Sequence, residues 1–294
     1  MAPHVVIIPT EGLCNRLRGM ASAHVLAKFY GTICFTLWFP EEACKCTFQD
    51  LFKNDLSEIN LAEVTTRSYL YKPDEHTNAL LARFPYSDSE YIIVRGGHEF
   101  KHPDMSVADF VRQKCEFYAS LRVSSRVEQA LLRHPSIIRG TVAVHFRDYV
   151  KQFDEADGRV FSEVSPLQDF LQIVQLIRTK HPERPVLICS NTARAYEQFK
   201  GLGNVIYRSD AERSRDSSEG IVDALVDVLA MSRCDIIIGT TMSSFSDEAC
   251  FFRGIPKLCM GRGGVDTYHC YGLSSVHGQP FLLGNLRIIR DLFE

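Results

Sequence analysis

Hydrophobic residues gather in short runs along the chain, and most of these runs are separated by segments with helical spacing. The first run is HVVIIPT at 4–10. From Leu13 onward the apolar positions recur every three or four residues until Gly31, a residue type that commonly ends helices. Further apolar runs indicate strands at 32–39, 91–97, 141–146, 185–190, 204–209, 234–240 and 256–260.

The segments between these runs predict helices at 105–117, 125–133, 166–179, 193–199 and 220–232, and after Ser246. Residues 39–89 are polar and rich in turn formers, which predicts irregular connections and short helices. Strands that alternate with helices predict parallel sheets covered on both faces. A chain of 294 residues can form two such α/β domains, 1–135 and 136–294, with a cleft between them.

The net charge of the chain limits the kinds of partner that it can bind. The chain has 33 basic and 36 acidic residues, a net charge of −3, so we expect no nucleic-acid partner and no general affinity for anionic membranes. No apolar stretch is long enough to cross a membrane, and the N-terminus has no basic stretch ahead of an apolar one. We therefore expect no membrane-spanning segment and a cytoplasmic location. The single close cysteine pair, Cys44 and Cys46, is a weak metal motif.

Two loops in the second half carry polar residues at the carboxyl ends of predicted strands, where open parallel sheets bind ligands. Arg147 follows the strand at 141–146, and TTMSSFS at 240–246 follows the strand at 234–240. A guanidinium beside a helix start with Ser246 as N-cap would suit a diphosphate. The alternatives are that Arg147 pairs with a carboxylate and that the hydroxyls only cap the helix. His145 contacts the ligand or is a hydrogen-bonded core residue.

The first half has a similar strand–loop–helix segment, PTEGLCNRLRGM at 9–20. Glu11 and Gly12 lie in the predicted loop, and Asn15 and Arg18 share one face at the start of the helix. Arg16 points in another direction. These residues are candidates for a site at the carboxyl edge of the first sheet. The alternative for Arg16 and Arg18 is that both are solvated.

Three segments resemble motifs of one enzyme superfamily. They are GLCNRLRGMASAHVLAKFYG at 12–31, VHFRDYVK at 144–151 and DALVDVLAMSRCDIIIGTTMSSFSDEACFFRG at 223–254. They are similar to the G-x-x-N-R-L helix, the H-x-R-R-x-D motif and the D-x-x-x-L-x-x-C-D…S-S-F-S motif of the fucosyltransferases that include the nodulation and core α1,6-, protein O- and bacterial α1,2-enzymes. The resemblance spans 5–37 and 140–260. It implies a GT-B-like α/β fold, in which two Rossmann-like domains face a central cleft and bind acceptor and donor respectively.

The resemblance also implies roles for individual residues. Arg147 matches the arginine on the donor diphosphate, and Asp227 matches a motif aspartate near the nucleotide. Asp148 departs from the pattern, because a second arginine is frequent at that position. The expected donor-binding residues are Gly12, Asn15, Arg18, His145, Arg147, Asp227, Thr241, Ser243, Ser244, Phe245 and Ser246.

The implied reaction is inverting, metal-independent transfer of a sugar, with fucose from GDP-fucose favoured, to an oligosaccharide or other glycan. The chain has no Asp-x-Asp triplet for a divalent ion, and we expect no metal and no cofactor. Arg147 would stabilise the leaving diphosphate, and Glu11 is the first candidate for the base, followed by Asp148 and Asp154. Two alternatives stay open: another donor such as UDP-xylose, which would make the protein a xylosyltransferase, and a non-catalytic protein that binds nucleotide sugars.

Overall fold

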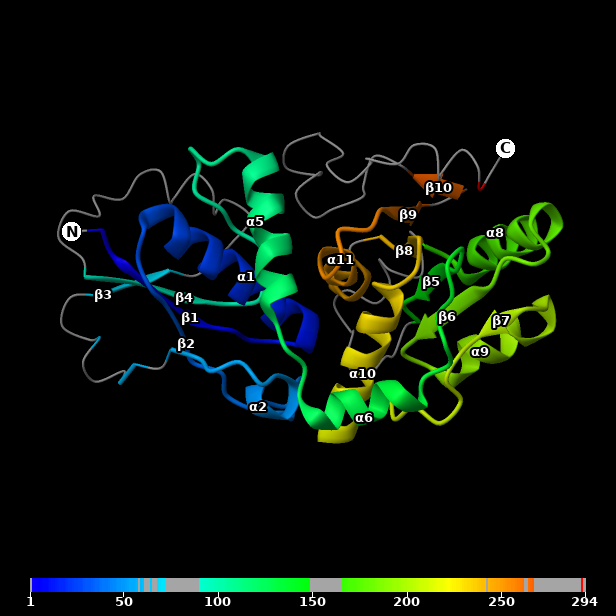
Figure 1. The fold of residues 1–294 in the computed structure, drawn as a ribbon, viewed down its shortest axis with the longest axis horizontal. Helices are drawn as coiled ribbons and strands as arrows, with labels where there is room; N and C mark the ends of the chain where they lie inside the picture. The colour runs from blue at the N-terminus through cyan, green and yellow to red at the C-terminus, as the bar shows by residue number, and fades with distance from the viewer. Residues whose placement is uncertain are drawn as a thin grey trace. The chain divides into compact units, whose positions relative to one another are not determined.

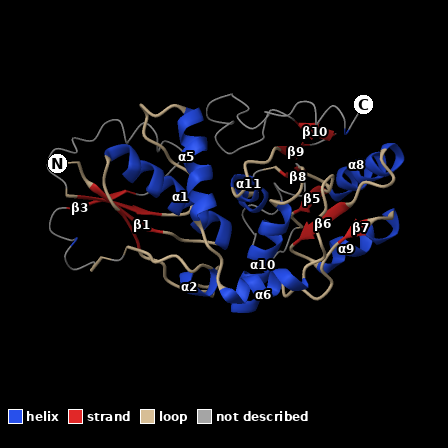
Figure 2. Cartoon of the chain, viewed as in Figure 1, coloured by secondary structure: helices blue, strands red, loops and turns tan. Residues whose placement is uncertain are grey.

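The computed structural model describes residues 2–57, 59–60, 64, 68–71, 90–148, 165–241, 243–261, 264–266 and 292. By their contacts the residues form two compact α/β units (Figures 1 and 2). Unit 1 contains Met1–Gln129 and Ser214–Leu225, and unit 2 contains Ala130–Arg213 and Val226–Glu294. The predicted division has a single boundary, whereas the chain returns to unit 1 at residues 214–225. The cleft between the domains stays a prediction.

Unit 1 contains a four-stranded sheet in the order β2-β1-β4-β3, and every pair in it is parallel. Its strands are β1 (His4–Ile8), β2 (Cys34–Thr36), β3 (Ser68–Tyr71) and β4 (Tyr91–Arg95). The central strand β1 buries Val5, Val6 and Ile7 completely, which explains its unbroken apolar run. The structure corrects the prediction for this sheet: β2 is Cys34–Thr36 rather than 32–39, β4 ends at Arg95 rather than at residue 97, and β3 was not predicted.

The helices of unit 1 follow the predicted spacing closely. In the described residues they are α1 (Leu13–Tyr30), α2 (Phe48–Leu51), α5 (Val107–Ser120) and α6 (Ser125–Arg133), and α6 continues into unit 2 from Ala130. Helix α1 begins after Gly12 and ends at Gly31, which adopts a left-handed conformation with φ of 66° as the C-cap. Helix α5 packs against α1 (Figure 1).

Unit 2 contains a six-stranded sheet in the order β10-β9-β8-β5-β6-β7. Its strands are β5 (Val142–Phe146), β6 (Val186–Ser190), β7 (Val205–Ile206), β8 (Ile236–Thr240), β9 (Lys257–Gly261) and β10 (Gly264–Asp266). All pairs are parallel except β9 with β10. The helical segments between them are α8 (Leu167–Lys180), α9 (Ala193–Phe199), η2 (Lys200–Leu202), α10 (Ser218–Met231) and α11 (Ser244–Phe251). The predicted parallel sheet with alternating helices is confirmed.

The order of the strands in unit 2 defines where a ligand can bind. From β5 the chain moves outward through β6 to β7, and α10 then returns it to β8 on the other side of β5 (Figure 2). From β8 the chain moves outward in the opposite direction to β9. In open parallel sheets, ligands bind at the carboxyl ends of the strands where the order reverses in this way, which here are β5 and β8.

In the part of the chain that the structure describes, no helix is both long and apolar enough to cross a membrane.

Candidate functional site

The carboxyl ends of β5 and β8 bring the two candidate loops of unit 2 to one edge of the sheet. The strands pair in parallel with His145 opposite Gly239. The backbone N–H of Arg147 donates to Thr240 Oγ1 at 2.9 Å, and the same hydroxyl donates to the His145 carbonyl at 3.2 Å. The Thr240 side chain thus fixes the start of the Arg147 loop against the start of the serine-rich loop.

Helix α11 begins at this edge, and its first turn differs from the prediction. The N-cap is Ser243 rather than Ser246, because the helix starts earlier in the run of hydroxyl residues. Ser246 lies fully buried within the helix and donates to the Ser243 carbonyl at 3.3 Å. The Ser243 side chain makes no capping hydrogen bond. The N–H groups of the first turn have no acceptor within the helix, so this end of α11 favours an anion.

The loop residue Thr241 is held to the neighbouring strand. Its hydroxyl donates to the Met260 carbonyl at 2.8 Å, and its backbone N–H donates to Ser165 Oγ at 3.1 Å. Ser165 Oγ in turn donates to the same Met260 carbonyl at 2.5 Å. Since the Thr241 hydroxyl is already committed to β9, its place in this structure is that of a support for the loop.

The imidazole of His145 is buried and stacks on the ring of Phe245, with centroids 5.0 Å apart. Burial lowers the pKa of His145 well below its usual value, and the charges of Lys257 and Arg147 lower it further. The ring is therefore neutral. Among the described residues, its Nδ1 atom has no hydrogen-bond partner.

An ion pair between Lys257 and Asp247 lies buried beneath the first turn of α11. Lys257 Nζ also donates to the Thr240 carbonyl at 3.4 Å. Burial opposes the charge on Lys257, yet the Asp247 carboxylate outweighs it and raises the pKa of the lysine. Gly239 allows this close packing, because a Cβ there would lie 2.5 Å from Ser246 Oγ and 2.9 Å from Lys257 Cε.

Asp148 links the loop after β5 to the loop after β6. Its carboxylate accepts from Thr192 Oγ1 at 2.6 Å and from Arg194 Nη2 at 2.9 and 3.1 Å. Its backbone N–H donates to Asn191 Oδ1 at 2.7 Å, and the Asn191 amide donates to its carbonyl at 3.0 Å. Asp148 stands where the superfamily often has a second arginine. Both oxygens of its carboxylate accept hydrogen bonds.

Asp227 of α10 lies in the same unit and is paired with Arg208. The Arg208 Nη1 to Asp227 Oδ1 distance is 3.6 Å, and both side chains are largely buried. The pair holds α10 to the segment after β7.

In unit 1 the loop between β1 and α1 presents Glu11 to solvent. Its backbone has a φ of 69°, a left-handed conformation that is strained for a residue other than glycine. Its carboxylate accepts a short hydrogen bond from the Asn15 amide and lies 3.8 Å from His98 Nε2. Gly12 is the N-cap of α1. The carboxyl edge of the first sheet thus combines an exposed carboxylate with an amide and an imidazole.

His98 and the glycine before it were missed by the sequence reasoning. They follow β4, the parallel neighbour of β1, so both loops reach the same edge. A Cβ on Gly97 would lie 2.6 Å from Asn15 Cβ and 3.0 Å from the Thr10 carbonyl oxygen. The pattern Gly-Gly-His directly after a buried strand is the signal that could have identified them.

Arg16 is fully buried, which excludes the alternative that its side chain is solvated. Its guanidinium donates to the carbonyls of Glu11 at 2.8 Å and Phe39 at 2.7 Å and to the Glu41 carboxylate at 2.9 Å. It also lies 5.0 Å from the centroid of the Trp38 ring. Arg16 thus ties the Glu11 loop to the segment after β2.

Arg18 is half-buried on α1, and its carbonyl accepts a hydrogen bond from Ser22 Oγ at 2.9 Å. Asp154, the third base candidate, lies outside the described residues.

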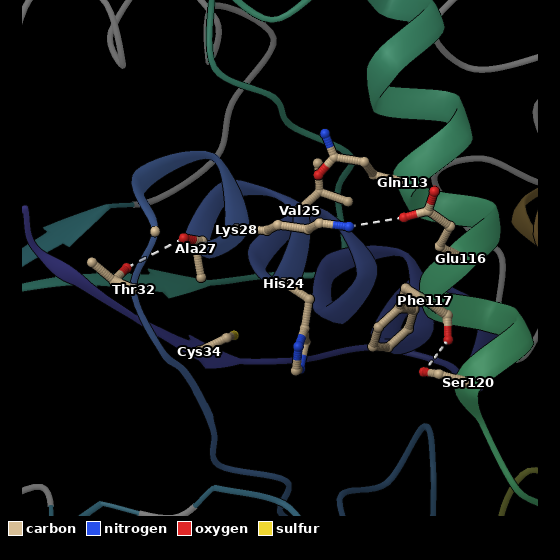
Figure 3. A pocket seen from close by; sticks show the side chains of 11 residues that line it. His24, Val25, Ala27, Lys28, Thr32, Cys34, Gln113, Glu116, Phe117 and Ser120 are labelled. Atoms are coloured by element: carbon tan, nitrogen blue, oxygen red, sulfur yellow. Dashed lines mark hydrogen bonds and ion pairs between the residues drawn. The ribbon is translucent and has the colours of Figure 1, made fainter.

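A cavity of about 490 Å³ lies in unit 1 between α1 and α5 (Figure 3). It is lined by residues of the second half of α1, so it is at the other end of this helix from Glu11. Lys28 pairs with Glu116 there at 2.8 Å, and the His24 ring lies 4.8 Å from the Phe117 ring. Burial lowers the pKa of His24 to about 4, so this packed imidazole is neutral.

No family model and no curated protein matches this sequence. Solved structures of fucosyltransferases nevertheless share its fold, the GT-B fold of two α/β units. NodZ from Bradyrhizobium is 16% identical, covers 90% of this chain and 98% of its own, and has a TM-score of 0.63. A FUT1 mutant from Arabidopsis thaliana in complex with GDP is 15% identical over 88% of this chain and 70% of its own, with a TM-score of 0.58.

POFUT1 in complex with GDP is 13% identical, with a TM-score of 0.51 over 86% of this chain and 95% of its own. At these identities the similarity establishes the fold. It confirms the fold class expected from the sequence, and it confirms the resemblance to fucosyltransferases at the level of structure.

Proposed function

We propose that this protein is a glycosyltransferase that transfers fucose from GDP-fucose to a hydroxyl of an oligosaccharide or other glycan, with inversion and without a metal. Support comes from the fold shared with NodZ, which has been soaked with GDP-fucose, and with POFUT1, which has been solved in complex with GDP. The observation that carries the proposal is the convergence of Arg147 and the N-terminus of α11 at the switch point between β5 and β8.

The donor diphosphate is proposed to bind at this edge of unit 2. The N–H groups of the first turn of α11 and the Ser243 and Ser244 hydroxyls donate to its oxygens. The Arg147 guanidinium stabilises the charge that grows on the leaving phosphate. The neutral His145, held by its stacking on Phe245, adds a hydrogen bond without adding charge. Thr241 and Asp227 keep the surrounding segments in place through their contacts within unit 2.

The acceptor is proposed to bind at the carboxyl edge of unit 1, beside Glu11, while Gly12, Asn15 and Arg18 keep their expected role in binding the donor. Glu11 takes the proton from the acceptor hydroxyl, while the Asn15 amide orients its carboxylate. The acceptor oxygen bonds to C1 of fucose on the face opposite GDP, and the C1–O bond to the phosphate breaks with its electron pair leaving on GDP. Asp148 is given a different role, because both oxygens of its carboxylate already accept hydrogen bonds, from Thr192 and Arg194.

No step of this proposal uses a metal or a cofactor, because Arg147 and α11 neutralise the leaving diphosphate. In the described residues, no group of three or more histidine, cysteine or acidic side chains could hold a metal ion. A cytoplasmic location is part of the same proposal.

Calorimetric titration of the protein with GDP and with UDP, followed by product analysis with GDP-fucose in EDTA, tests the proposal. We expect GDP to bind much more tightly than UDP, and GDP-fucose to be hydrolysed slowly to fucose and GDP, with water in place of the glycan, at a rate that EDTA does not change. Binding of UDP alone would support a UDP-sugar donor such as UDP-xylose. Binding of GDP-fucose without any release of GDP would support a non-catalytic protein. Loss of turnover in EDTA would contradict metal independence.

A further inference from the structure

We infer that Arg194 is a second cationic residue of the donor site, which Asp148 holds in position to contact a phosphate of the nucleoside diphosphate. This inference rests on the proposed function. Arg194 lies in the first turn of α9, outside the three segments that resemble the superfamily motifs. The ligand class is the same diphosphate that Arg147 and α11 are proposed to bind.

The register of the sheet places Arg194 at the required edge. Strand β6 is the parallel neighbour of β5, and their last residues, Phe146 and Ser190, are directly opposite each other. The loops that carry Arg147 and Arg194 therefore leave the sheet at the same level and on the same edge. Adjacent strands are about 4.8 Å apart, so the starts of the loops after β8, β5 and β6 span roughly 10 Å. One nucleoside diphosphate with its sugar can contact all three loops.

The contacts of Asp148 show how Arg194 is held. The carboxylate is on a side chain that is 7% exposed, whereas the Arg194 side chain is 76% exposed. Both contacts to the carboxylate use Arg194 Nη2, at 2.9 and 3.1 Å. In the described part of the chain, Nη1 and Nε of Arg194 make no hydrogen bond. The guanidinium is thus fixed through one nitrogen, while its other donors remain available to a ligand.

This arrangement differs from an ordinary surface ion pair. Exposed pairs stabilise little, because two flexible side chains lose entropy when they meet. Here the carboxylate is rigid, since Thr192 donates to it and Asn191 binds the Asp148 backbone at both N–H and carbonyl. Arg194 is therefore partly ordered before the diphosphate binds. The entropy lost on binding is smaller, which favours binding. Asp148 is then a positioning residue that acts through Arg194.

The test compares GDP binding by the wild-type protein and by Arg194→Met, which keeps the aliphatic length and removes the charge. We expect the variant to bind GDP about tenfold more weakly, as the loss of one charged hydrogen bond predicts. Arg194→Lys should recover only part of this affinity, because it restores the charge without the planar fork. The matched control is Lys200→Met at the other end of the same helix, where an exposed pair with Glu197 is lost and GDP affinity should not change.

A double-mutant cycle tests the role of Asp148. In an Asp148→Asn background, Arg194→Met should weaken GDP binding by much less than tenfold, because the guanidinium is no longer held. An equal loss in both backgrounds would overturn the positioning role. Unchanged GDP affinity in Arg194→Met, while Arg147→Ala loses it, would overturn the inference and leave the proposed function intact. A wild-type protein that binds no nucleoside diphosphate would overturn both. Thermal unfolding of each variant without ligand establishes that it is folded.

Discussion

The carboxyl edges of the two sheets are built in different ways. In unit 2 the edge rests on buried polar groups: the Lys257–Asp247 pair, the neutral His145 and the Thr240 hydroxyl that joins two loops. In unit 1 the edge presents the exposed carboxylate of Glu11 on a strained backbone, and the buried charge beneath it is Arg16. A fixed set of charges suits a ligand whose charge is constant, such as a diphosphate. An exposed carboxylate suits a group that must exchange a proton.

The largest effect on activity is expected at the carboxyl edge of the sheet in unit 2. We expect Arg147→Ala to lower kcat/KM for GDP-fucose by about 10³-fold or more, because charge on the leaving phosphate would lose its guanidinium. The melting temperature should stay close to that of the wild type, since the backbone N–H of residue 147 still donates to Thr240. Steady-state kinetics and thermal unfolding provide the measurements. Normal turnover by Arg147→Ala would contradict the assignment of Arg147 to the donor site.

At the exposed edge, the conservative substitution Glu11→Gln should lower kcat by about 10²-fold, in line with the loss of a general base. GDP affinity should be unchanged, because in the proposal this carboxylate acts on the acceptor alone. Single-turnover rates and calorimetric titration separate the two quantities. A weaker affinity for GDP with an unchanged rate would place Glu11 with the donor instead.

Buried and exposed arginines of unit 1 should differ sharply in stability. We expect Arg16→Met to lower the free energy of unfolding by about 3 kcal/mol, because two carbonyls and the Glu41 carboxylate lose their donor. Arg112→Met serves as the control. It removes an exposed arginine paired with Asp109 and Glu116 and should barely change stability. Urea unfolding measures both, and equal effects would contradict the structural role of Arg16.

The close packing beneath α11 can be tested by adding one methyl group at Gly239. Gly239→Ala should cost about 1–3 kcal/mol of stability and weaken GDP binding, because its Cβ would displace Ser246 and Lys257. Gly201→Ala is the matched control in the same unit, since its Cβ would have no heavy atom within 4 Å. An unchanged GDP affinity in a destabilised Gly239→Ala would show that the start of α11 does not depend on this packing.

The smallest effect concerns the far end of α1, where the half-buried His24 is neutral. Its folded-state pKa of about 4 is below its ordinary value, so the unfolded chain binds more protons between these values. Stability should therefore fall as the pH drops through this range, by about 1–2 kcal/mol between pH 7 and pH 5. We expect His24→Gln to remove this part of the pH dependence. Denaturant unfolding at both pH values measures it, and parallel curves for the two proteins would contradict it.

Much of the fold could be predicted, because buried parallel strands appear in the sequence as short apolar runs and helices as apolar residues spaced three or four apart. The bounds of α1 and α6 follow from apolar spacing and, for α1, from Gly31. The N-cap of α11 was misplaced because Thr240 to Ser246 offers several hydroxyls with the same local preference. Tertiary packing selects Ser243 among them, since Ser246 is needed under the helix against Gly239.

The loops of the candidate site could be predicted from the sequence, but the buried residues that hold them in place could not. Arg147 and the serine-rich loop could be assigned to one edge because both follow apolar strands. The burial of Arg16 could not be predicted, because an arginine on a helix is usually solvated and its partners Trp38 and Glu41 are distant in sequence. Lys257 was not identified for the same reason, since a lysine at the start of a strand gives no sign that it is buried beneath a helix.

The return of residues 214–225 to unit 1 has a consequence for the synthesis of the protein. Arg126 donates to Ser218 Oγ and to the Glu219 carboxylate at 2.6 Å, across more than 90 residues of sequence, and Cys46 Sγ lies 3.2 Å from Ser218 Oγ. Domains generally fold in order as the chain leaves the ribosome. Here the contacts of Arg126 and Cys46 with Ser218 can form only after residues 130–213 of the second unit have been translated. Completion of unit 1 therefore depends on the synthesis of part of unit 2.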